Sequence, residues 1–249
     1  KNLGVGTFVE QARNYLKANV NILKLILKHN IDKHNIEAGI TLKDEHIKEY
    51  SNEYEMRDSS GYSIPHTGTD LNMIYSLNAN NRINSRRIES YIQDTWKFSS
   101  ANENTLFTLN YGARISHWSY NKETIVSPRI SLVVIPSFNK NITLRLATGV
   151  YYQAPFFKEL RDTTSTNGIT TVSLNNKIKS QKSIHIIAGM DYRFNIANRP
   201  FKFSADAYYK ILSNLIPYSV NNVKVVYDGR NEASGHAAGI DFKLYGEFV

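Results

Sequence analysis

The sequence predicts an all-β fold, a segment of an antiparallel transmembrane β-barrel with about nine strands of a larger barrel. Three observations predict it: apolar and polar residues alternate with a period of two, the alternating segments are long, and short and long connections alternate between them. Period-two alternation places apolar side chains on one face of a strand and polar side chains on the other. A barrel in a membrane needs this division, because its outer face meets lipid and its inner face meets water.

Composition agrees with this fold class. The 249 residues include 16 Tyr and 11 Phe but only 2 Trp, and amphipathic rings such as tyrosine suit a boundary between lipid and water. The mean hydropathy of -0.40 does not oppose a membrane location, because alternating strands are hydrophilic on average. No segment reaches the ~18 consecutive apolar residues that a membrane-spanning helix requires.

Charge and motif content exclude several function classes. The net charge is +8, but Lys and Arg are scattered among Asp and Glu, so we expect no nucleic-acid partner. The absence of cysteine excludes disulfides and thiolate metal sites. No HExxH, GxSxG or P-loop pattern occurs, and His29 and His34 stand too isolated for a metal site. We therefore expect no enzyme activity, no metal and no cofactor.

The first strands are the least regular. Tyr15–Lys28 changes phase near Leu23, which predicts a β-bulge, although this segment also fits an amphipathic helix. Ile36–Lys43 alternates as a strand. In Ile88–Phe98, Asp94 falls on the otherwise apolar face, and the pattern leaves this position unexplained.

The later strands alternate more clearly. In Phe107–Ile115, every second residue from Phe107 is apolar, whereas Arg114 belongs to the other face. Their expected length of roughly 10–13 residues exceeds the ~5–6 of globular sheets and suits a tilted membrane strand. The further predicted strands are Arg129–Val134, Ile142–Tyr152, Ile184–Phe194, Phe201–Lys210 and Ala238–Leu244.

The connections divide into two kinds. The short ones are Asn30–His34, Ser99–Asn104, Pro136–Lys140 and Ile196–Pro200. The long ones are Tyr50–Asn84, Ala154–Lys182 and Pro217–Gly235, and Tyr120–Ser127 is a modest loop where a long one is expected. This division is typical of outer-membrane barrels, which have short periplasmic turns and longer extracellular loops. Because the strand count is odd and no signal peptide precedes the first strand, we expect a segment of a longer protein.

Several motifs in order resemble one family. They are His34–Gly39, Tyr91–Trp96 (YIQDTW), Ser127–Leu132 (SPRISL), Asn141–Leu146, Gly149–Leu160 (GVYYQAPFFKEL) and Asn231–Leu244. Together they resemble the barrel of TonB-dependent outer-membrane receptors.

The resemblance implies a bacterial outer-membrane location and a complete barrel of about 22 strands. It implies TonB-driven active import of a scarce ligand: an iron chelate, cobalamin or an oligosaccharide. The expected partners are the plug domain of the same receptor, through it the TonB complex, outer-membrane lipid, the ligand and a surface lipoprotein. Residues 1–249 would form part of the barrel, with the plug domain outside this segment.

Three groups of candidate residues follow from these expectations. Charged residues of the polar face should line the lumen, because an Arg or Lys facing lipid at mid-membrane costs ~2–4 kcal/mol; whether they contact the plug or only face water stays open. The lumen-facing candidates are Arg114, Arg129, Arg145, Asp191, Arg193, Asp206 and Asp241. The extracellular-loop ligand candidates are Tyr54, Tyr62, His66, Tyr75, Phe156 and Phe157. The expected membrane-interface aromatics are Trp96, Tyr152, Phe194, Phe201 and Tyr209.

Two other function classes remain open from the residues alone. A soluble β-sandwich that binds a glycan or another ligand would point its apolar faces inward against a second sheet. A passive outer-membrane porin would share the barrel and conduct without a plug. The positions of the apolar residues in Ile142–Tyr152 and Ile184–Phe194 separate the sandwich from both barrels.

Overall fold

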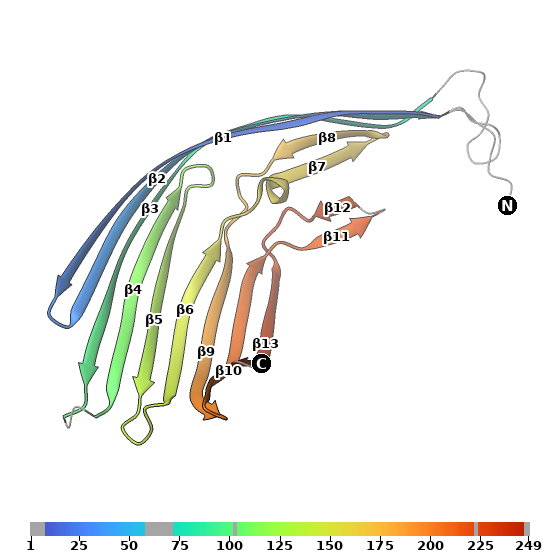
Figure 1. Ribbon diagram of the computed structural model, residues 1–249. Coiled ribbons are helices and arrows are strands. Elements are labelled where there is room, and N and C mark those ends of the chain that lie inside the picture. Colours follow the sequence, from blue (N-terminus) through green and yellow to red (C-terminus); the bar gives the residue numbers. More distant parts are fainter. Residues whose placement is uncertain (1–7, 58–71, 102–103, 222–223, 247–249) are drawn as a thin grey trace, which may run out of the picture.

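The computed structural model describes residues 8–57, 72–101, 104–221 and 224–246. Nine strands follow one another in a single antiparallel sheet, in the order β1-β2-β3-β4-β5-β6-β9-β10-β13. Their bounds are β1 (Phe8–Ile31), β2 (His34–Arg57), β3 (Asn72–Ser99), β4 (Leu106–Trp118), β5 (Glu123–Ile135), β6 (Ile142–Gln153), β9 (Gln181–Ile196), β10 (Arg199–Leu215) and β13 (Ala233–Gly246). This order confirms the predicted barrel segment, a curved wall whose edge strands are β1 and β13 (Figure 1).

Smaller elements occupy the ends of the wall opposite the short turns (Figure 1). They are the 3-10 helix η1 (Phe157–Leu160) and the strands β7 (Arg161–Thr166), β8 (Ile169–Leu174), β11 (Tyr218–Asn221) and β12 (Lys224–Tyr227). β7 and β8 form a hairpin, and β8 also pairs in parallel with β3. β11 and β12 form a separate two-stranded sheet.

The strand register separates two faces of the wall. One row crosses the sheet through Leu109, Leu132, Leu146, Ala188, Ala207 and Ile240, and all its members are apolar. The adjacent row on the other face contains Arg145, Gly189, Asp206 and Asp241. Leu146 and Ile240 are 57% and 63% exposed. The apolar residues of β6 and β9 therefore point outward and, in the described part of the chain, pack against no second sheet, which contradicts a sandwich.

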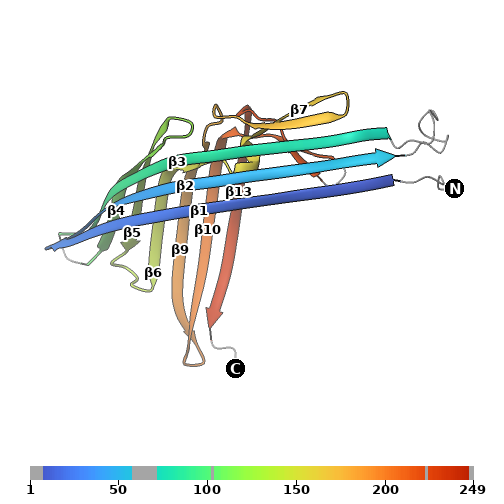
Figure 2. The same cartoon turned by 90° about the horizontal axis from the view of Figure 1, so that it is seen from above.

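The first three strands are much longer than expected. The predicted loop Tyr50–Asn84 was wrong in extent, because β2 continues to Arg57 and β3 begins at Asn72. Figure 2 shows β1, β2 and β3 reaching far beyond the other strands. In the outer part of β3 the apolar residues Tyr75, Leu77, Ala79 and Ile83 lie on the polar face of the wall, so the apolar pattern changes face although backbone pairing continues.

The predicted bulge near Leu23 is also wrong. β1 pairs with β2 without a register shift from Phe8 to Ile31. The phase of the sequence changes because Ile22 and Ile26 are apolar on the polar face while Leu23 and Leu25 occupy the apolar face. The register shifts in the described strands lie elsewhere, in β2 between Glu55 and Met56 and in β10 between Leu212 and Leu215.

Turns also differ from the prediction in places. The connection expected at Tyr120–Ser127 is a tight turn, because β4 ends at Trp118 and β5 begins at Glu123. Between β9 and β10, Ala197 and Asn198 have φ values of 49° and 62°, and two consecutive positive φ angles are typical of type I′ hairpin turns. The loops predicted at Ala154–Lys182 and Pro217–Gly235 contain the β7–β8 and β11–β12 hairpins.

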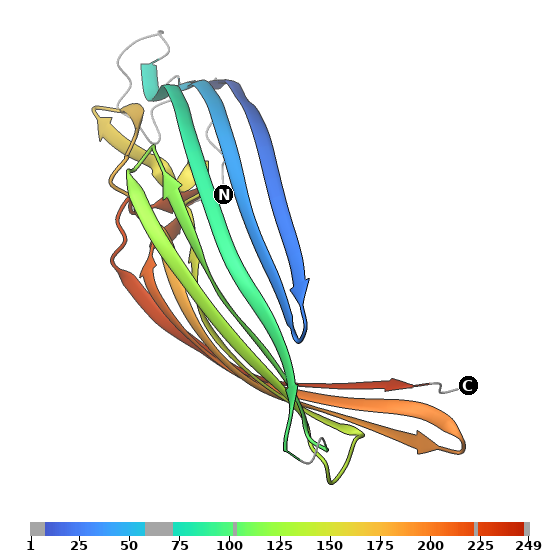
Figure 3. The same ribbon diagram turned by 90° about the vertical axis from the view of Figure 1, so that its left-hand side faces the viewer.

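A small core lies on the polar side of the wall, away from the short turns. Leu160 of η1 and Ile178 pack against Ile83 of β3 and Trp118 of β4, together with Ile216. Figure 3 shows the wall curving, with the smaller elements gathered at one end. No helix in the described ranges is long and apolar enough to cross a membrane.

Candidate functional site

The charged residues of the polar face form an ion-pair network across β6, β9 and β10. Arg145 donates to Asp191, and its Nη2 lies 2.7 Å from Asp206 Oδ1. Lys202 Nζ lies 3.1 Å from Asp191 Oδ2, and Ser204 Oγ donates to Asp191 Oδ1 at 2.6 Å. Asp191 is only 5% exposed. The network therefore joins three of the lumen-facing candidates and is charge-balanced.

Gly189 makes room for this network. A Cβ at Gly189 would collide with Asp206 Oδ1 and would lie 3.0 Å from Arg145 Nη2. In register, Gly189 lies between Arg145 and Asp206. The absence of a side chain at this position lets the guanidinium reach across β9. Sequence alternation alone identified the charged residues but not Gly189 or Ser204, because their roles depend on strand register.

The other lumen-facing candidates lie apart from this network. Arg193 is in register with Lys202, and Asp241 is in register with Asp206, and both candidates are exposed. Arg114 Nη1 lies 3.9 Å from Glu89 Oε2, on β3. The Arg129 guanidinium lies 4.3 Å from the centroid of the Tyr151 ring. All seven candidates share the polar face, and ion pairs join three of them, Arg145, Asp191 and Asp206.

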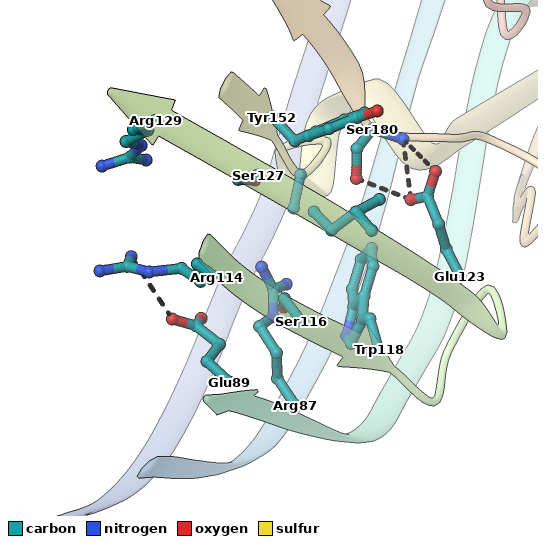
Figure 4. A pocket seen from close by; sticks show the side chains of 12 residues that line it. Arg87, Glu89, Arg114, Ser116, Trp118, Glu123, Ser127, Arg129, Tyr152 and Ser180 are labelled. Atoms are coloured by element: carbon teal, nitrogen blue, oxygen red, sulfur yellow. Dashed lines mark hydrogen bonds and ion pairs between the residues drawn. The ribbon is translucent and has the colours of Figure 1, made fainter. Parts of the chain in front are cut away.

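A cavity of about 100 Å³ lies on this face where β3, β4 and β5 run side by side. Arg87, Arg114 and Arg129 line it, together with Glu89 and Glu123 (Figure 4). Sequence analysis missed Arg87, Glu89 and Glu123. The signal that could have found them is register, since all three lie on the polar face of strands that neighbour one another.

Glu123 attaches the segment before β9 to the wall. Its Oε2 accepts hydrogen bonds from the Ser180 backbone N–H at 2.9 Å, the Ser180 hydroxyl at 2.6 Å and the Asn121 amide at 3.1 Å. The Asn121 amide also donates to the Ile178 carbonyl at 2.9 Å. In the turn between β4 and β5, burial raises the pKa of Tyr120 because its ionised form loses hydration. The loop is therefore held against the polar face by polar and apolar contacts.

The extracellular-loop candidates do not form one group. Tyr54 and Tyr75 lie in β2 and β3, where their hydroxyls donate to Gln11 and to Glu53 respectively. Phe156 is 62% exposed at the start of η1, whereas Phe157 packs against the small core. Tyr62 and His66 lie outside the described residues.

Aromatic side chains gather near the short turns on the apolar face. His34, Trp96, Phe98 and Phe107 stack in succession across β2, β3 and β4. Tyr192, Phe194 and Phe201 stack in the same way across β9 and β10. The other two expected interface aromatics are not in these stacks: Tyr209, on the apolar face, stacks with His236 at a ring-centroid distance of 6.2 Å, and Tyr152 lines the cavity on the polar side.

Asp94 on the apolar face now has an explanation. Its Oδ2 lies 2.6 Å from His34 Nδ1 and accepts a hydrogen bond from the Tyr111 hydroxyl at 2.9 Å. His34 in turn stacks on Trp96. Asp94 is 8% exposed, so neighbouring side chains cover a carboxylate that would otherwise be unfavourable in lipid.

Comparisons with known proteins agree with this architecture. The family model for "TonB dependent receptor-like, beta-barrel" matches residues 4–249. No match was found among curated protein sequences.

Solved structures share the fold at low identity. The RagAB peptide importer in its "closed-closed" state has a TM-score of 0.54 at 13% identity, and the match covers 95% of this chain and 28% of that one. The outer-membrane transporter YddB from Escherichia coli has a TM-score of 0.52 at 15% identity, and the match covers 95% of this chain and 31% of that one. The siderophore receptor PirA from Acinetobacter baumannii has a TM-score of 0.51 at 15% identity, and the match covers 95% of this chain and 40% of that one.

The chain thus spans less than half the length of each of these structures. Three observations indicate the same kind of protein: the apolar outer face, the charged inner face and the family match over nearly all residues. Receptors of this kind are located in the outer membrane of Gram-negative bacteria. This chain belongs to the TonB-dependent receptor family, as part of its β-barrel domain.

Proposed function

We propose that this chain is part of the wall of a receptor that takes up a scarce ligand by TonB-driven active transport. The observation that carries the proposal is the division of the wall into an exposed apolar face and a face with a charge-balanced network. A receptor wall needs the first against lipid and the second toward an aqueous lumen. The ligand classes are those that the resemblance implies: an iron chelate, cobalamin or an oligosaccharide.

Uptake in cells tests this proposal. Cells with the full-length receptor would be given three labelled probes, a ferric catecholate chelate, cyanocobalamin and maltohexaose, with and without a functional TonB protein. We expect one probe to accumulate only when TonB is present. Equal accumulation without TonB would support the passive porin instead.

We further propose that the polar face holds a plug domain of the same receptor through its charged groups. Arg145 is 32% exposed at its side chain even within its ion pairs, and Arg193 is exposed on the same face, beyond Asp191 on β9. Both can therefore reach a second surface in the lumen. Through such a plug the wall would be linked to the TonB complex, and a surface lipoprotein could cover the outer end.

Conductance of the full-length receptor in planar bilayers tests plug contact. The charge reversals Arg145→Glu and Arg193→Glu should loosen the plug and raise the conductance. Arg82→Glu, at an exposed position on the other face of β3, is the matched control and should leave it unchanged. Unchanged conductance in both Arg145→Glu and Arg193→Glu would show that these residues only face water.

A further inference from the structure

Four cations on the polar face lie over aromatic rings. The Arg87 guanidinium carbon is 4.5 Å from the centroid of the Trp118 ring, and the Arg114 guanidinium carbon is 5.5 Å from the centroid of the Tyr91 ring. Arg129 lies 4.3 Å from the Tyr151 ring. The fourth pair is Lys210 and Tyr208, at 5.1 Å. A guanidinium over a ring uses its flat face, so N–H donors in its plane remain free for a planar anion.

The carboxylates near these arginines do not satisfy them. Glu123 is engaged by Ser180 and Asn121. Glu89 lies 2.8 Å from Lys43 Nζ but 3.9 Å from Arg114. Hydrogen bonds of good strength need donor–acceptor distances near 2.7–2.9 Å, so Arg114 keeps donor capacity.

Arg87 and Arg129 also lack a close carboxylate acceptor among the described residues. The carboxylate partner of Arg87 is Glu45, at 3.8 Å, and the buried Arg87 Nε has no hydrogen-bond partner among the described residues. Arg129 has no carboxylate within salt-bridge distance in the described part of the chain. A buried donor without a partner is unfavourable and indicates a missing acceptor.

All three arginines meet at one cavity. Arg87, Arg114 and Arg129 line the cavity of about 100 Å³ described above, together with Ser116, Ser127 and Tyr152. Figure 4 shows Arg114 and Arg129 extending toward the same side of this space, with Arg87 next to them. We propose that this arginine cavity binds a carboxylate group, with Arg114 and Arg129 as its principal donors.

The surrounding wall favours an anion as well. The row that contains Arg129 runs across Gly149 and His185 to Lys210, which is its second cation. This row carries no acidic residue from β5 to β10. Cations gathered on one side of an enclosed aqueous space raise the local concentration of anions.

The carboxylate could come from the imported ligand or from an acidic side chain of the plug. In this respect the inference rests on the proposed function, which puts a ligand and a plug in the lumen. Calorimetric titration of the full-length receptor with succinate, with neutral succinamide as the control ligand, tests the site. A ligand site predicts succinate binding that weakens about a hundredfold in Arg114→Gln/Arg129→Gln, since each of the two lost charge-assisted bonds contributes about a factor of ten.

The control variant Arg82→Gln removes one positive charge outside the cavity and should bind succinate as the wild type does. If the wild type binds no succinate but Arg114→Gln/Arg129→Gln raises bilayer conductance and Arg82→Gln does not, the plug supplies the carboxylate. If neither succinate binding nor conductance depends on Arg114 and Arg129, the inference is overturned.

Uptake measured in parallel separates this inference from the proposed function. Succinate binding that depends on the two arginines, without TonB-dependent uptake, would support the arginine cavity and overturn active transport. TonB-dependent uptake, with neither succinate binding nor conductance depending on the two arginines, would support active transport and overturn the arginine cavity.

Discussion

At the scale of single residues, the structure explains the charges that alternation places on each face. Asp191 lies almost buried on the inner face, yet Arg145, Lys202 and Ser204 satisfy its carboxylate. Asp94 lies on the outer face, where His34 and Tyr111 supply the hydrogen bonds that lipid cannot. Polar residues in this wall are therefore tolerated where strand register supplies a partner.

Removing the Asp94 carboxylate should destabilise the receptor. Asp94→Ala leaves the His34 ring and the Tyr111 hydroxyl without their shared acceptor, and an unsatisfied polar group costs about 1–3 kcal/mol. Urea unfolding of the full-length receptor in lipid vesicles would measure this loss. Tyr111→Phe added to Asp94→Ala should recover part of it, because the orphaned hydroxyl is then gone; a double variant less stable than Asp94→Ala would contradict the explanation.

Gly189 gives a second test at the residue scale. Gly189→Ala places a methyl group against Asp206 and Arg145, and overpacking of this kind costs about 1–3 kcal/mol. Gly235→Ala is the matched control, because the nearest atom to its added Cβ is 4.0 Å away. Thermal unfolding should show a lower transition temperature for Gly189→Ala alone. Equal effects of both substitutions would mean that the close approach at Gly189 does not matter.

At the scale of elements, alternation predicted the strands well wherever one face was apolar. Ile142–Tyr152 and Ile184–Phe194 correspond closely to β6 and β9. The pattern failed in the outer parts of β2 and β3, because β2 carries few apolar residues there and those of β3 lie on the opposite face of the wall from the apolar residues of its inner part. It also failed in β1, where apolar residues on both faces looked like a bulge.

The candidate site shows the same division between what the sequence reveals and what register adds. Alternation placed Arg114, Arg129 and Arg145 on one face, but it could not tell that Arg145 has two carboxylate partners while Arg129 has none among the described residues. Nor could it show that Tyr152 lines a cavity on the polar side. Such neighbours come from strands far apart in sequence.

Loop attachment can be tested at this scale. Glu123→Ala removes the acceptor for Ser180 and Asn121, so the segment from η1 to Ser180 should open more often. Hydrogen exchange of the full-length receptor should be faster across this segment, by roughly tenfold for a loss of ~1.4 kcal/mol. Glu232→Ala, an exposed glutamate outside this contact, should leave it unchanged; exchange that Glu123→Ala does not alter would show that the apolar core alone holds the loop.

At the scale of the whole molecule, the wall is one curved sheet whose two faces meet different solvents. Exposed apolar side chains such as Leu146 and Ile240 would be a liability in water, whereas lipid is their natural environment. The charged network and the arginine cavity face the opposite side. The proposed transport, plug contact and carboxylate binding all depend on this division.

Site-directed spin labelling tests the division most directly, and the chain helps because it contains no cysteine. Single cysteines at successive positions of Ile142–Gln153 would be labelled in the full-length receptor in lipid bilayers. Labels at Leu144, Leu146 and Thr148 should collide with oxygen dissolved in lipid, whereas those at Thr143 and Ala147 should be shielded from it. A period of two in oxygen accessibility is the predicted result; oxygen accessibility that is uniform along the strand, or highest at Thr143 and Ala147, would contradict the account.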